Sequence, residues 1–133
     1  NMDSGMFMPV QMAAARALAL GPEWYAELNA TYSLRREKVF RLLDLLNCRY
    51  DERQAGMFVW ARIPGRYADG YALSDAVLSS ARVFITPGGI FGSRGRGYIR
   101  VSLCASEQTL ENALRRIQAA GPFETMTVNP GIQ

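Results

Sequence analysis

Residue types that carry much of enzyme chemistry are scarce or missing in this 133-residue sequence. It contains no histidine, which excludes a Ser–His–Asp triad, a Cys–His pair and a histidine metal site. Of its 15 basic residues all but one are arginine, and Lys38 is the only lysine. A chain of this composition is a poor candidate for an enzyme that works alone.

Cysteine and long apolar runs are also scarce. Cys48 and Cys104 have no CxxC spacing, so we expect no metal site; two reduced thiols are favoured and a disulfide stays open. No segment approaches the roughly 20 apolar residues that a membrane span needs. The first ten residues lack the charged and apolar regions of a signal peptide. We therefore expect a cytoplasmic protein without a membrane partner.

The residues that are present indicate a folded domain. Hydrophobic residues make up 49% and charged residues 20%, as in ordinary globular proteins. The net charge of +3 is too small to indicate nucleic-acid binding by itself. The length suits one domain, or one domain with a connecting element.

Two helices are predicted in the first third of the chain. Residues 10–20 are rich in alanine, follow Pro9 and precede Gly21-Pro22, so they predict a helix. Residues 22–46 predict one long helix of roughly 35 Å, with Asn47 as its stop. Its apolar residues recur on one stripe: Trp24, Leu28, Tyr32, Val39, Leu43 and Leu46. We expect this stripe to be buried against a sheet that carries Val59, Ile99 and Val101, with Leu114 nearby.

The remaining elements alternate between strands and helices. Short strands are predicted at 48–52, 57–63, 83–85 and 97–103, and a helix at 71–81. Ser106 is a good cap for a last helix with the apolar stripe Leu110, Leu114 and Ile117, and residues 120–133 form an irregular tail. This order predicts an α/β two-layer (α+β) small domain. Its sheet has three to four mostly antiparallel strands with helices on one face, preceded by a long bridging helix.

A segment rich in glycine and arginine, residues 86–100, is a candidate for chemistry. It has five glycines and three arginines, but neither of the common phosphate-loop spacings. Two alternatives remain open: a nucleic-acid contact, in which Arg94 and Arg96 meet phosphates and Tyr98 stacks on a base, or a surface turn with solvated arginines.

The strand after this segment carries the strongest candidate residue. Ile99, Val101 and Leu103 share one face, so Arg100 points away from the core from the middle of a strand. A guanidinium held on a rigid element is well suited to grip a carboxylate with two hydrogen bonds. The alternative is a surface ion pair, or packing against Tyr98.

Several of these segments together resemble class I/II aminotransferases of the aspartate aminotransferase fold (fold type I). The run VFITPGGIFGSRGRGYIRVSL at 83–103 resembles the end of these enzymes, and GMFVWARI at 56–63 resembles the strand before it. LRREKVFRLLDLLN at 34–47 is similar to their domain-bridging helix, and NMDSGMFMPVQMAAARAL at 1–18 to the segment that enters the preceding helix. The matches follow the family's order over about residues 1–119.

The resemblance implies an enzyme with pyridoxal 5′-phosphate bound to a lysine of a larger domain. The arginine that matches Arg100 binds the substrate's α-carboxylate, and the functional unit is a homodimer. We expect residues 1–21 to end the large cofactor domain, 22–119 to form the C-terminal small domain, and 120–133 to form the tail. Lys38 does not stand in the family's lysine context. No catalytic, cofactor-binding or metal residue is therefore expected in this chain, which should be inactive without the missing N-terminal large domain.

The reaction expected of the parent protein is transfer of an amino group between an amino acid and a 2-oxo acid. The alternatives are another fold-type I enzyme, such as a β-lyase or an acyl transferase, or a free-standing basic module that binds nucleic acid or protein. No nucleic-acid partner is expected on the preferred interpretation.

Overall fold

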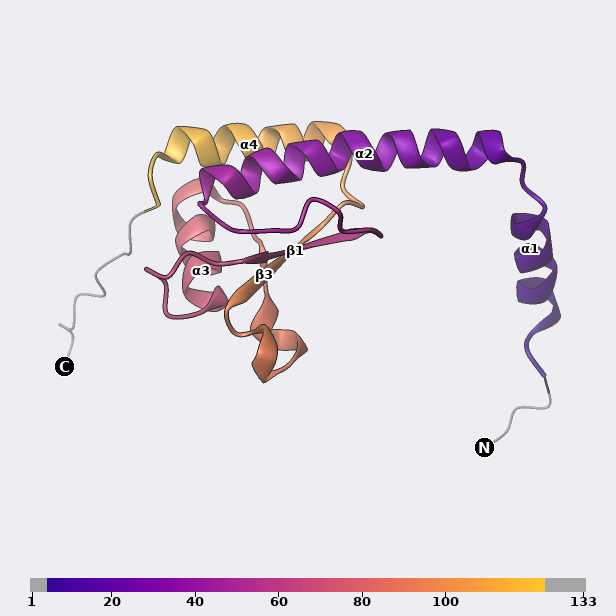
Figure 1. Cartoon of the computed structure of the whole chain (residues 1–133), viewed down its shortest axis with the longest axis horizontal. Helices are drawn as coiled ribbons and strands as arrows, with labels where there is room; N and C mark the ends of the chain where they lie inside the picture. Colours follow the sequence, from indigo (N-terminus) through magenta and orange to yellow (C-terminus); the bar gives the residue numbers. More distant parts are fainter. Residues whose placement is uncertain (1–4, 124–133) are drawn as a thin grey trace. The chain divides into compact units, whose positions relative to one another are not determined.

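The computed structural model describes residues 5–123 (Figure 1). Its helices are α1 (Met8–Leu18), α2 (Pro22–Leu45), α3 (Gly70–Ala81) and α4 (Glu107–Ala120). Its strands are β1 (Phe58–Arg62), β2 (Thr86–Pro87) and β3 (Tyr98–Ser102), with the 3₁₀ turns η1 (Gly88–Phe91) and η2 (Ser93–Gly95) between the last two. The chain divides into two compact units between Thr31 and Tyr32, inside α2.

Capping residues set the ends of three of the helices. The Ser106 hydroxyl accepts a hydrogen bond from the Thr109 N–H, which confirms it as the cap of α4. The Asp69 carboxylate does the same for α3, accepting from the N–H groups of Tyr71 and Ala72. Asn47 adopts a left-handed φ of 55° just after α2, as its predicted role as a stop requires.

The sheet of the second unit has three antiparallel strands in the order β1-β3-β2. The prediction of a strand at 83–85 is wrong, because pairing begins only at Thr86. Ile85 is buried, and its carbonyl accepts a hydrogen bond from the Ser74 hydroxyl of α3 at 2.5 Å instead of joining the ladder.

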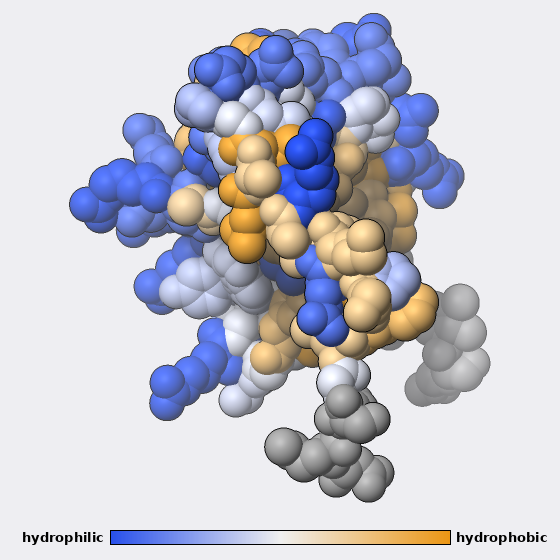
Figure 2. Space-filling view, turned by 90° about the vertical axis from the view of Figure 1, so that its right-hand side faces the viewer, coloured by the Kyte–Doolittle hydropathy of each residue, from blue (hydrophilic) through white to orange (hydrophobic). Residues whose placement is uncertain are grey.

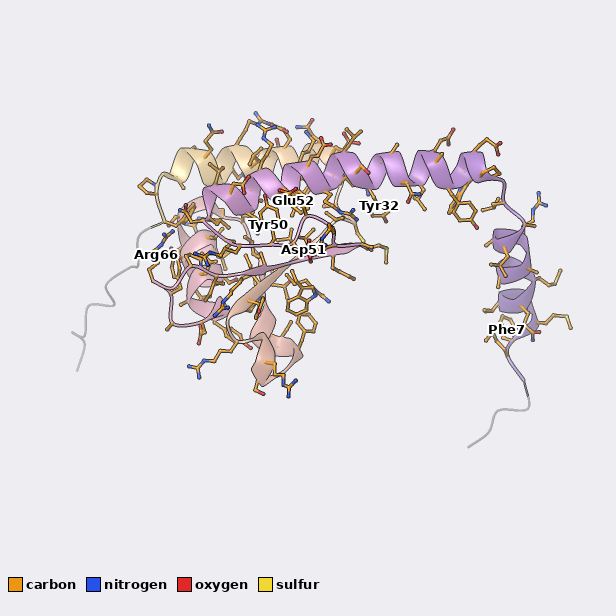
Figure 3. All side chains as sticks on the ribbon, viewed as in Figure 1. Phe7, Tyr32, Tyr50, Asp51, Glu52 and Arg66 are labelled. Atoms are coloured by element: carbon orange, nitrogen blue, oxygen red, sulfur yellow. The ribbon has the colours of Figure 1, made fainter. Side chains whose placement is uncertain are left out.

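The predicted strand at 48–52 is likewise reduced to a single bridge between Arg49 and Arg62. The next residue, Tyr50, turns toward α2 (Figure 3). Its ring stacks on Phe40 with the centroids 4.4 Å apart, and its hydroxyl donates to Asp44 at 2.8 Å. Contacts with the helix therefore replace further strand pairing.

One hydrophobic core lies between the sheet and the helices of the second unit. The sheet contributes Val59, Ala61 and Ile99 to this core. The helices contribute Val39 and Leu43 of α2, Leu73 and Val77 of α3, and Leu110, Leu114 and Ile117 of α4. The second half of α2 lies beside α4, and the Lys38 ammonium is 2.7 Å from the Glu111 carboxylate (Figure 1). Helices thus cover one face of the sheet, as predicted.

The predicted stripe of α2 is only partly buried. Val39, Leu43 and Leu46 are fully buried, and Tyr32 packs at the edge of the core. Trp24 and Leu28 are 45% and 37% exposed, so the prediction that they are buried is wrong. Both lie in the first unit, whereas every residue of the core belongs to the second. Val101 is half-buried and packs against the core.

The first unit, described from residue 5 to residue 31, has a largely apolar surface. No residue of α1 is buried. The exposed large hydrophobic residues of this unit are Met6, Phe7, Met8, Val10, Met12, Leu18, Trp24, Tyr25 and Leu28. Figure 2 shows apolar side chains over much of the surface turned to the viewer.

Candidate functional site

Arg100 occupies the centre of the sheet face that the helices leave uncovered. It lies in the middle strand, opposite Trp60 of β1 and Thr86 of β2. Its neighbours Ile99 and Val101 point to the core side, as the alternation predicts. The structure therefore places Arg100 on the outer face, where it is half-buried.

Two aromatic rings, and no acidic side chain, surround the guanidinium of Arg100. Its Cζ lies 4.1 Å from the ring centroid of Phe58 and 4.0 Å from that of Phe91. Within residues 5–123, the ion pairs and side-chain hydrogen bonds of the structure do not include Arg100. The alternative that Arg100 packs against Tyr98 is not what is seen, because the rings that it contacts belong to Phe58 and Phe91.

The glycine-rich segment has a structural role beside this site. A side chain on Gly88 would collide with the backbone of Gly95, and Gly92 has a φ of 125° that favours glycine. These two features fold the segment into η1 and η2, and η1 ends with Phe91 beside Arg100.

The two arginines of the nucleic-acid alternative, Arg94 and Arg96, are both exposed. Arg96 is 3.7 Å from the Asp69 carboxylate. The Tyr98 ring makes an edge contact with Trp60, at 6.4 Å between centroids. One of the two arginines of the nucleic-acid alternative thus has an acidic partner.

The outer edge of β1 is completed by a side chain. The Gln54 amide accepts a hydrogen bond from the Trp60 N–H at 2.8 Å and donates one to the Trp60 carbonyl at 2.9 Å. Trp60 is the cross-strand partner of Arg100, so Gln54 stabilises the strand segment that supports the site. Sequence reasoning missed Gln54, because no local pattern links it to Trp60.

Sequence reasoning also missed Phe58 and Phe91 as parts of the site. The alternation in residues 57–63 is a signal for Phe58, since Val59 and Ala61 face the core. No comparable signal exists for Phe91, whose position depends on the glycine-rich turn.

The described residues do not by themselves fit a pyridoxal phosphate site. Lys38, the only lysine of the sequence, is ion-paired with Glu111 on the helical side of the sheet.

Cys48 and Cys104 are both free thiols, and burial raises the pKa of Cys48 to about 12. Residues 5–123 contain no cluster of acidic or cysteine side chains suited to a metal ion, and no helix among them is long and apolar enough to cross a membrane.

The fold and the site together define a small α/β domain that presents one aromatic-flanked arginine on the open face of its sheet. Residues 1–117 match the family model described as aminotransferase class I and II. The chain belongs to this family. Pyridoxal phosphate is the cofactor of its full-length members.

Named relatives agree with this assignment. The chain is 41% identical over 120 residues to an LL-diaminopimelate aminotransferase of Oleidesulfovibrio alaskensis, covering 88% of this chain and 30% of that protein. An LL-diaminopimelate aminotransferase of Moorella thermoacetica is 34% identical over 118 residues, with 89% and 30% covered. The chain thus spans about 30% of the length of these curated relatives.

Solved structures show the same fold. Substrate-bound BacF from Bacillus subtilis superposes with a TM-score of 0.71 at 31% identity, covering 92% of this chain and 32% of that chain. An aromatic aminotransferase from Pyrococcus horikoshii superposes with a TM-score of 0.69 at 30% identity, covering 83% and 30%.

Proposed function

We propose that this chain is the substrate-carboxylate-binding part of a pyridoxal-phosphate-dependent aminotransferase. The enzyme transfers an amino group between an amino acid and a 2-oxo acid. The observation that carries the proposal is Arg100, which projects from the middle strand of the sheet and has no acidic partner within residues 5–123. Membership of the aminotransferase family supports the reaction type.

In this proposal Arg100 holds the α-carboxylate of the substrate. A guanidinium offers parallel N–H donors to both oxygens of a carboxylate, which sets orientation as well as position. Holding the substrate at this end aligns its Cα–H bond for proton removal by a base elsewhere in the enzyme. The same contact serves both substrates, because an amino acid and a 2-oxo acid each carry a carboxylate next to the reacting carbon.

The rest of the enzyme supplies what this chain lacks. We propose that residues 1–21 belong to the larger cofactor domain and 22–119 to the small domain. The Schiff-base lysine then lies in the larger domain, and the working unit is a homodimer. Identities of 41% and 34% to two LL-diaminopimelate aminotransferases make LL-diaminopimelate the first amino donor to test.

The decisive experiment replaces Arg100 in the full-length enzyme. Arg100→Lys keeps the charge and loses the planar fork, so kcat/KM should fall for amino acids and 2-oxo acids alike. The fall should correspond to a loss of roughly 2–4 kcal/mol of transition-state stabilisation. An amine that lacks the α-carboxylate should lose little. Equal losses for the amino acid and for the amine would contradict the carboxylate-binding role.

The same assay separates the reaction types. A β-lyase or an acyl transferase would consume its amino acid without forming a new amino acid from an added 2-oxo acid. Formation of that second amino acid in stoichiometric amount is the expected result.

A further inference from the structure

We propose that Phe58 and Phe91 are positioning residues that hold the Arg100 side chain for its ligand. This inference rests on the carboxylate-binding role proposed for Arg100. Both rings lie about as close to the guanidinium carbon as a cation–π contact allows, at 4.1 and 4.0 Å. Two separate segments, β1 and η1, therefore meet at one side chain.

Each ring is held in place by its own segment. Phe58 lies on the outer face of β1, two residues from Trp60, so it is the diagonal neighbour of Arg100. Phe91 is the last residue of η1 and makes an edge contact with Trp60 at 5.4 Å between centroids. Trp60 thus supports Phe91 while it stands opposite Arg100 on the neighbouring strand.

The chemistry of the rings explains why aromatic residues suit this role better than acidic ones. An arginine side chain on an open sheet face has many rotamers, and ordering them on binding costs affinity. Aromatic rings attract the cation and restrict its position, but they take up none of its N–H donors as a carboxylate would. The donors stay available, and the positive charge stays uncompensated, for an anionic ligand.

The partial exposure of the rings agrees with a role at an open site. Phe58 is 36% exposed and Phe91 is 48% exposed, although both contact the same guanidinium. Neither residue belongs to the hydrophobic core of the second unit. Their replacement should therefore act on Arg100 more than on folding.

The test uses the full-length enzyme with Phe58→Leu and Phe91→Leu. Each variant should raise KM for the amino acid and for the 2-oxo acid by about 3- to 30-fold, while kcat changes little. Phe58→Tyr and Phe91→Tyr should restore KM to near the wild-type value, since tyrosine also attracts a cation. Phe84→Leu is the matched control: this phenylalanine is 66% exposed and makes no cation–π contact in the described part of the chain.

A double-mutant cycle separates positioning from a general structural effect. If the rings act through the cation of Arg100, Phe58→Leu and Phe91→Leu should raise KM much less in an Arg100→Gln background, which has no cation for the rings to attract. The rate with an amine that lacks the α-carboxylate should stay unchanged throughout. Should a leucine variant fold poorly, Phe→Met at the same position supplies a flexible apolar side chain without the ring and repeats the test.

The outcomes for the two proposals differ. Unchanged KM in the leucine variants, with Arg100→Lys still selective against the carboxylate substrates, would overturn the positioning role alone. An equal rise in KM with Arg100 intact and in the Arg100→Gln background would overturn it as well. An Arg100→Lys variant that treats amine and amino acid alike would instead overturn the carboxylate-binding role on which the inference depends.

Discussion

At the scale of single residues, environment rather than residue type decides the chemistry. Arg100 lies against two rings, whereas Lys38, the other candidate cation, is engaged by a carboxylate 2.7 Å away. Tyr50 shows the same dependence, because burial, the hydrogen bond to Asp44 and the charges of Asp44 and Glu52 raise its pKa to about 12. Each of these differences can be measured.

The first residue-scale prediction concerns Lys38. After incubation with pyridoxal phosphate and borohydride reduction, the 133-residue chain should carry no stable adduct at Lys38. The reason is that the Lys38 Nζ is held 2.7 Å from the Glu111 carboxylate, on the helical side of the sheet and away from Arg100. Mass spectrometry of the reduced peptide is the measurement. A stoichiometric adduct at Lys38 would contradict the expectation that another part of the enzyme holds the cofactor.

The second residue-scale prediction concerns alkaline pH. The pKa of Tyr50 is higher in the folded chain than its ordinary value of 10.0, so the folded state favours the neutral phenol. The resulting stabilisation is complete below about pH 10 and is lost as the pH rises from about 10 to about 12. Titration at 295 nm should show a late tyrosine signal that Tyr50→Phe removes. Asp44→Asn should bring its pKa down, and an unchanged late phase in Tyr50→Phe would refute the assignment.

At the scale of elements, α2 shows how one helix has two environments. Its periodic stripe was recognisable along the whole length, yet only the part from Tyr32 onward meets the core. Periodicity reports which side chains share a face, and it does not report whether another layer covers that face. The shortened β2 has a similar origin, because the contact of Ile85 with Ser74 outweighs its strand propensity.

The element-scale prediction compares two leucines of α2. Leu43 is fully buried and Leu45 is exposed, although both belong to the same helix and the same unit. Leu43→Ala should lower the free energy of unfolding by about 2–5 kcal/mol, through lost burial and the cavity left behind. Leu45→Ala should lower it by less than about 0.5 kcal/mol. Chemical denaturation of both variants gives the comparison, and similar losses would show that the stripe does not pack as described.

At the scale of the whole molecule, the chain combines a packed unit with an apolar one. The second unit has its own core, whereas α1 buries none of its residues. Exposed apolar surface of this extent is typical of a segment that packs on another protein part. This agrees with the proposal that residues 1–21 belong to a larger domain.

The whole-molecule prediction follows from that surface. The 133-residue chain should self-associate as its concentration rises, because Phe7, Met12 and Leu18 are exposed. Sedimentation velocity over a concentration series is the measurement. Met12→Lys with Leu18→Glu should reduce the association, and Ala15→Lys, on the same helix, is a control for added charge alone. A chain that stays monomeric at all concentrations would contradict the prediction.

Local sequence patterns were enough to predict the helices, the strands β1 and β3, and the direction in which Arg100 points. Helical periodicity, capping residues and strand alternation are local, so a few neighbouring residues suffice to set them. The motif order was enough to indicate the family. Three features appear only in the folded chain: β2 begins at Thr86, Trp24 and Leu28 are exposed, and Phe58 and Phe91 meet at Arg100. Those features depend on strand register and on a turn that joins distant segments, and no local pattern carries that information.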